Sequence, residues 1–125
     1  MIRAFVILTL AASGYASRYD PGVFERVVQT RMRYGQLEAS AANWKGGYIA
    51  LLEPDLIGQT VYVCHQDECE WLLVADCAGH ADGGYAWMVR GGYAGELDYE
   101  TAMRWGAVGG IIHVYVERTV TALWN

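Results

Sequence analysis

Short runs of hydrophobic residues, separated by turn residues, make up most of the chain. The clearest unit spans residues 60–76, where TVYVC and CEWLLVAD are typical of two β-strands joined by a short polar turn. If Cys64 faces Cys69 across such a hairpin, then Tyr62 faces Trp71 on the same face of the sheet. The pattern therefore predicts a β-hairpin with a defined register.

Strand-like runs also occur elsewhere in the chain. Residues 47–52 and 111–116 predict strands, and the second run, IIHVYV, is rich in β-branched residues that favour strands. The glycine-rich segment 78–95 predicts a loop with a short strand near residues 85–89. Residues 38–47 predict a loop.

Helical segments are fewer in this sequence. Residues 98–105, DYETAMRW, predict a short helix that Asp98 caps and Gly106 ends. Residues 23–34 fit a helix by the spacing of their apolar residues, but their valines also suit a strand, so both alternatives stay open. Together these segments predict a small β-barrel or sandwich with one short helix.

The first residues are typical of a secretory signal peptide. Arg3 precedes the apolar run at residues 4–12, and small residues stand at the positions that place cleavage after Ala16. The run is shorter than the roughly 20 residues that span a bilayer. We predict a signal peptide at residues 1–16 and a folded domain at residues 17–125. The protein would then be secreted, periplasmic or at the cell surface, with no integral membrane span. The alternative for the first segment is a buried first strand.

Composition narrows the function classes. Hydrophobic residues make up 54% of the 125 residues, which supports one folded domain. The net charge of −5 argues against a nucleic-acid partner, because nucleic-acid binding needs a basic surface. Nine tyrosines and five tryptophans against two phenylalanines suit a wet binding surface, although strands also favour these residues.

Three short stretches, in their order and spacing, resemble a known family. ASRY at residues 16–19 matches an opening strand, and LVAD at residues 73–76 matches a barrel strand that ends in aspartate. ELDY at residues 96–99 precedes an apolar helix, a glycine and a closing strand. Together they resemble the double-psi β-barrel of rare-lipoprotein-A-like and expansin-like proteins. The resemblance implies a mainly β fold, a six-stranded double-psi β-barrel with one or two short helices.

Proteins of this family are secreted and act on cell-wall polysaccharide. The resemblance implies an exported protein that cleaves or remodels peptidoglycan or a related glycan, as a glycoside hydrolase or a lytic-transglycosylase-like enzyme without a cofactor. The alternative is a non-catalytic, expansin-like module that binds glycan or loosens the wall. A structural or interaction domain unrelated to glycans is a third hypothesis.

Two aspartates are the candidate catalytic residues. Cleavage of a glycosidic bond needs a proton donor and a second carboxylate that acts as a base or stabilises charge. The resemblance implies that Asp98 is the acid and Asp76 its partner. The alternatives are a helix cap for Asp98 and a turn residue for Asp76. The catalytic histidine of the lipoprotein-like enzymes has no counterpart at residues 49–52, IALL. This departure favours a carboxylate-only mechanism or no bond cleavage.

Four further residues are candidates for substrate binding. Tyr19 matches the opening-strand tyrosine of the family, and His80 follows Asp76 in a glycine-rich loop. Aromatic rings stack on the apolar faces of sugars. Trp87 and Tyr93 are the preferred candidates for such a stacking platform, because glycine-rich loops flank them. Core packing or solvent exposure is the alternative for each. The wider set of candidate platform residues is Trp44, Tyr48, Trp87, Tyr93 and Trp105.

The three cysteines fit an oxidising compartment. The hairpin register predicts a Cys64–Cys69 disulfide, which leaves Cys77 unpaired or bonded to another chain. Zinc binding by the cysteines and His80, or a Cys77 nucleophile assisted by His80, are alternatives, but the spacings are not those of common zinc sites. We therefore predict no metal. We also place His65 at the hairpin tip and His113 in the packing of the closing strand.

Overall fold

Six strands of the chain close into a barrel. The structure, a computed structural model, describes residues 1–79, 81–107 and 109–123. The order around the barrel is β1-β5-β2-β4-β3-β6. β1 pairs with β5 and β2 with β4 in parallel, and the other neighbours are antiparallel. The mainly β, six-stranded fold is thus confirmed. The bounds are β1 Ile2–Arg18, β2 Tyr48–Leu51, β3 Thr60–His65, β4 Glu68–Cys77, β5 Tyr93–Leu97 and β6 Ile111–Leu123.

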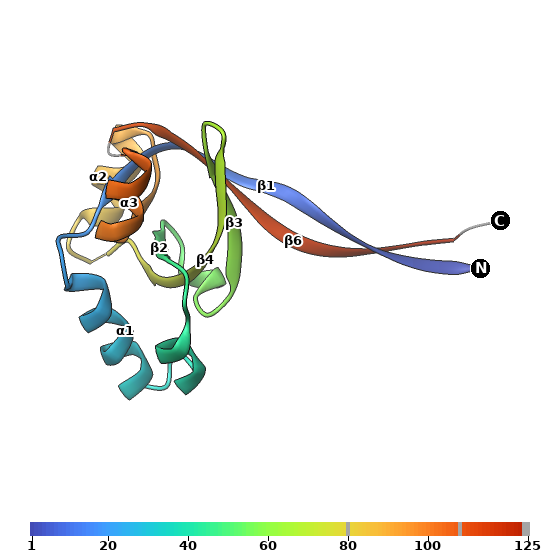
Figure 1. Cartoon of the computed structure of the whole chain (residues 1–125), viewed down its shortest axis with the longest axis horizontal. Coiled ribbons are helices and arrows are strands. Elements are labelled where there is room, and N and C mark those ends of the chain that lie inside the picture. Colours follow the sequence, from blue (N-terminus) through green and yellow to red (C-terminus); the bar gives the residue numbers. More distant parts are fainter. Residues whose placement is uncertain (80, 108, 124–125) are drawn as a thin grey trace.

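Three short α-helices accompany the barrel, one more than the upper number predicted. They are α1 Val23–Arg33, α2 Gly84–Gly91 and α3 Tyr99–Trp105, and the 3-10 turns are η1 Ala39–Asn43 and η2 Pro54–Leu56. The helices lie on the side of the molecule away from the tip of a long β1–β6 ribbon (Figure 1). Residues 23–34, for which a helix and a strand both stayed open, contain helix α1.

The strand predicted near residues 85–89 is wrong, because this segment forms α2. Gly83 and Gly92, with φ angles of 83° and 73°, flank the helix in the left-handed conformation that glycine adopts readily. Alanine, methionine and arginine between them are good helix formers. The valine and the aromatic residues here also favour strands, but they do not outweigh these helix formers.

The predicted hairpin is confirmed in its register. Cys64 pairs with Cys69 and Tyr62 with Trp71, and the two cysteines form a disulfide. The rings of Tyr62 and Trp71 lie 5.2 Å apart between centroids. The hairpin thus joins β3 to β4 as the alternation of residues indicated.

Two histidines differ from their predicted places. His65 is not at the hairpin tip: it is the last residue of β3, it is buried, and its ring stacks with Trp105 at 6.5 Å. His113 does not pack in the core, because it points outward from β6 and shares a 2.6 Å hydrogen bond with the Ser13 hydroxyl. Strand alternation decides both cases, since neighbours in a strand face opposite sides.

Two apolar clusters hold the fold together. The barrel interior is filled by branched and small residues from all six strands and from α3, among them Ile49, Leu72 and Leu97. A second cluster packs α1 and the following loop onto the outer face of β2 and β4, with Phe24 at its centre. α1 is therefore fixed beside the sheet where its polar side chains can reach strand residues.

The outer halves of β1 and β6 leave the barrel as a two-stranded ribbon (Figure 1). Residues 2–9 pair with residues 116–123 there, and nearly all of them are exposed. The alternative of a buried first strand is wrong for residues 4–12, because the strand forms but most of these residues remain exposed. Signal-peptide cleavage after Ala16 stays a prediction. Over the described residues, the helices are all too short or too polar to cross a bilayer.

Candidate functional site

Asp76 lies at the centre of a polar cluster between β4 and α1. Its carboxylate accepts hydrogen bonds from the Tyr19 hydroxyl at 2.5 Å and from Nε of Arg31 at 3.1 Å. Nη2 of Arg31 forms an ion pair with the same carboxylate. Phe24 of α1 stacks on the Tyr19 ring with 4.2 Å between centroids, which fixes the tyrosine in place. Residues from two segments that are far from Asp76 in the chain thus converge on one carboxylate.

A second carboxylate, Glu96, faces the same side of the sheet. Asp76 is opposite Ala50 on β2, and Ala50 is opposite Glu96 on β5. Glu96 is in turn opposite Ser17 on β1. Directly opposed residues on neighbouring strands share a face, so these four side chains form one row across the outer surface of the barrel.

The two carboxylates have different electrostatic surroundings. Burial raises the pKa of Glu96, the Ser17 hydroxyl opposes this shift, and the charge of Asp76 raises the pKa further. Glu96 therefore holds its proton to a higher pH than an exposed glutamate. Burial and the bond to Asp76 also raise the pKa of Tyr19 far above its usual range, so its hydroxyl remains a donor. Arg31 supplies the positive charge next to Asp76.

Asp98 occupies a different position from the one expected of a catalytic acid. Its side chain is 5% exposed, and it accepts a 3.3 Å hydrogen bond from the main-chain N–H of Thr101 as the N-cap of α3. Burial raises its pKa, and the bonds from Thr101 oppose that shift. The predicted helix cap is confirmed. Its catalytic role stays a prediction, and the structure gives Glu96, not Asp98, as the carboxylate in the row with Asp76.

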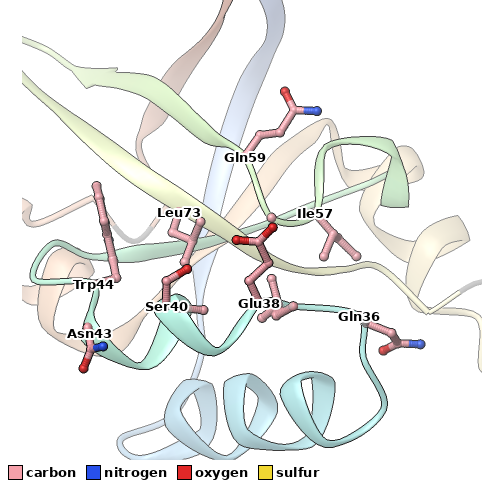
Figure 2. A pocket seen from close by; sticks show the side chains of 11 residues that line it. Gln36, Glu38, Ser40, Asn43, Trp44, Ile57, Gln59 and Leu73 are labelled. Atoms are coloured by element: carbon pink, nitrogen blue, oxygen red, sulfur yellow. The ribbon is translucent and has the colours of Figure 1, made fainter.

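Two cavities adjoin this cluster. The one beside Asp76 has a volume of about 380 Å³ and is lined mainly by α1 residues, including Thr30 and Arg31. The second, of about 560 Å³, lies between η1 and β4 beside Trp44 (Figure 2). Gln36 lines both cavities and accepts a 3.0 Å hydrogen bond from Nη1 of Arg31. The two cavities are therefore neighbours at Gln36.

The aromatic residues predicted to bind substrate form a pair. Trp87 and Tyr93 stack with 4.8 Å between ring centroids, and Trp87 is 51% exposed. Tyr15 packs edge-on against Tyr93 at 6.2 Å. The wider candidates Tyr48 and Trp105 are mostly taken up in packing. His80 lies outside the described residues, and the sugar-binding role of the pair stays a prediction.

Cys77 follows Asp76 as a free, half-buried thiol. Burial raises its pKa, although Arg31 close by opposes the shift. A nucleophilic cysteine needs a lowered pKa, so this environment argues against the alternative of a Cys77 nucleophile. Within residues 1–79, 81–107 and 109–123, histidine, cysteine and acidic side chains form no cluster that could hold a metal ion.

Glu96 and Arg31 are site residues that were not predicted from the sequence. Alternation along residues 93–97 places Glu96 on the face opposite to that of Leu97, but it does not indicate that Asp76 shares this face. Arg31 gave no comparable signal, because only the packing of α1 against the sheet brings it to Asp76. A local pattern therefore gives the face that Glu96 occupies, whereas contacts between distant segments bring both residues to Asp76.

Comparison of the chain with protein-family models, with curated protein sequences and with solved structures found no match.

Proposed function

We propose that the chain is an exported protein that cleaves or remodels cell-wall polysaccharide, such as peptidoglycan, on a barrel of the double-psi type. The observation that supports the proposal best is the row in which Asp76 and Glu96 share one face of three adjoining strands. The Tyr19 hydroxyl donates to the first carboxylate, and burial and this hydrogen bond raise the pKa of Tyr19. A carboxyl that keeps its proton to a higher pH, beside a second carboxylate, is what glycoside cleavage requires.

Each carboxyl has a role that its surroundings suit. Glu96 keeps its proton to a higher pH, so it serves as the general acid that protonates the leaving oxygen. Asp76, oriented by Tyr19 and Arg31, activates a water molecule on the other side of the sugar ring. The two backbones are two strand spacings apart, about 10 Å. In an inverting reaction the water lies between the two carboxyls.

One observation favours the non-catalytic alternative. Arg31 donates to Asp76 through two nitrogen atoms, and Tyr19 takes the other carboxylate oxygen. A base that already accepts three hydrogen bonds has less capacity to accept a proton from water. In this second candidate function, the same surface binds glycan and loosens the polymer without breaking bonds.

The experiment that separates these functions is incubation of the whole protein with purified peptidoglycan, followed by mass spectrometry of the soluble products. We expect new reducing ends with the parent protein and a loss of about a hundredfold or more in rate with Glu96→Gln, because general acid catalysis contributes this much. Asp98→Asn tests the acid that the resemblance indicates. Glu117→Gln, on the exposed ribbon, is the matched control and should keep the parent rate.

The outcomes assign the function. Products that vanish in Glu96→Gln but persist in Asp98→Asn support the Asp76–Glu96 pair. Products that vanish only in Asp98→Asn identify Asp98, the N-cap of α3, as the acid. This result overturns the Asp76–Glu96 pair. Retention on the polymer without products supports the binding function, and neither retention nor products with any cell-wall polymer overturns the proposal.

A further inference from the structure

The cavity beside Trp44 is separate from the carboxylate row, and Gln36 links it to the cavity beside Asp76. It has a volume of about 560 Å³, within the range of ligand-binding pockets. Figure 2 shows Ser40 and Glu38 rising between Trp44 and Ile57, with Leu73 behind them. The lining residues are Gln36, Leu37, Glu38, Ser40, Ala41, Asn43, Trp44, Ile57, Gly58, Gln59 and Leu73.

The chemistry of this lining selects a class of ligand. Amide and hydroxyl groups of Gln36, Asn43 and Ser40 can both donate and accept hydrogen bonds, as the hydroxyls of a sugar require. Leu73 and the Trp44 ring supply apolar surface for the C–H faces of sugar rings. Among the described residues around the cavity, none carries a positive charge, and Glu38 is acidic. The lining therefore disfavours phosphates and other anions.

The Trp44 ring is held in one orientation before any ligand arrives. Its indole N–H donates a 2.8 Å hydrogen bond to the main-chain oxygen of Gly47. Gly46 packs so closely that a Cβ there would lie 2.9 Å from Cζ2 of the ring. A ring that is already fixed loses little conformational entropy on binding, which favours its use as a stacking surface.

We infer that this cavity, defined by Trp44, Asn43, Ser40 and Glu38, is a binding subsite for a neutral oligosaccharide. The inference rests on the proposed function, because the glycan would continue past Gln36 towards Arg31 and Asp76. The subsite holds a part of the polymer away from the reacting bond. It therefore contributes to affinity and to the placement of the chain, and it takes no part in proton transfer.

The test uses the whole protein and a soluble tetramer of β-1,4-linked N-acetylglucosamine. NMR spectra follow the indole N–H signals during titration, and Trp44→Phe assigns the signal of Trp44. We expect this signal to shift with the tetramer and Asn43→Ala to weaken binding by about tenfold, since sugar hydrogen bonds are lost. Asn43 is exposed, so this variant should fold as the parent does. Trp71→Phe, an exposed tryptophan on the hairpin, is the matched control and should bind as the parent does.

Three results would overturn the subsite. If the tetramer binds while the Trp44 signal stays still and Asn43→Ala has parent affinity, the subsite is wrong and the proposed function survives elsewhere on the surface. If the fully deacetylated, cationic tetramer binds tighter and Glu38→Gln abolishes that preference, the neutral class is wrong. If no tetramer binds and no polymer is retained or cleaved, the proposed function fails with it.

Discussion

The same two strands, β1 and β6, have very different surroundings in their two halves. In the barrel half Ala16 is 1% exposed, and a Cβ on Gly14 would lie 2.3 Å from the main-chain oxygen of Gly92. In the ribbon half, Val6 is 64% exposed although its strand pairing continues. The ribbon has backbone pairing without a third layer, and two strands alone are at best marginally stable in water. Stability in this molecule should therefore come from the barrel half.

Removal of N-terminal residues tests most directly whether stability comes from the barrel half. We expect the chain that lacks residues 1–9 to keep a melting temperature close to that of the parent, because only the ribbon half of β1 is removed. The chain that lacks residues 1–16 also loses the β1 residues that pair with β6 at the barrel, so we expect it to lose cooperative unfolding. Circular dichroism during heating measures both.

This pair of truncations also bears on the predicted signal peptide. Cleavage after Ala16 would leave only Ser17 and Arg18 of β1. A stable fold without residues 1–16 would show that β1 is dispensable and contradict the comparison. The intact mass of the protein isolated from cells then decides whether that cleavage occurs.

Two apolar substitutions in β6 compare the contributions of the barrel and the ribbon to stability. Ile112 is 0% exposed in the barrel interior, whereas Val120 is 41% exposed on the ribbon. We expect Ile112→Ala to lower the free energy of unfolding by about 2–5 kcal/mol, because a cavity forms where the side chain was packed. Val120→Ala should change it by less than about 0.5 kcal/mol. Urea denaturation measures both, and equal losses would mean that the ribbon is as well packed as the barrel.

The smallest expected effect is a dependence on pH. Because the pKa of Glu96 is raised in the folded state, its contribution to stability is present below the unfolded value near 4.5 and is lost as the pH rises through the folded pKa. Glu96→Gln should therefore gain stability over the parent at pH 7 and lose that advantage near pH 4. Urea denaturation at the two pH values provides the test. Glu117→Gln on the ribbon should show no such trend, and a similar trend there would assign the effect to general charge.

Local sequence determined the elements whose signals lie within a few residues. Alternation around the polar turn gave the β3–β4 hairpin, its register and the Cys64–Cys69 disulfide, and Asp98 and Gly106 gave the ends of α3. Alternation cannot distinguish a short apolar helix from a strand when glycines surround it, and α2 was missed for this reason.

Tertiary structure decided which side chains meet. Arg31 reaches Asp76 only because Phe24 and Val28 anchor α1 on the outer face of the sheet. Glu96 joins Asp76 only because β2 pairs with both of their strands, which are far apart in the chain. Sequence patterns report which face a residue occupies within its own segment. The neighbours of that face depend on contacts between residues far apart in the chain, and no local pattern encodes them.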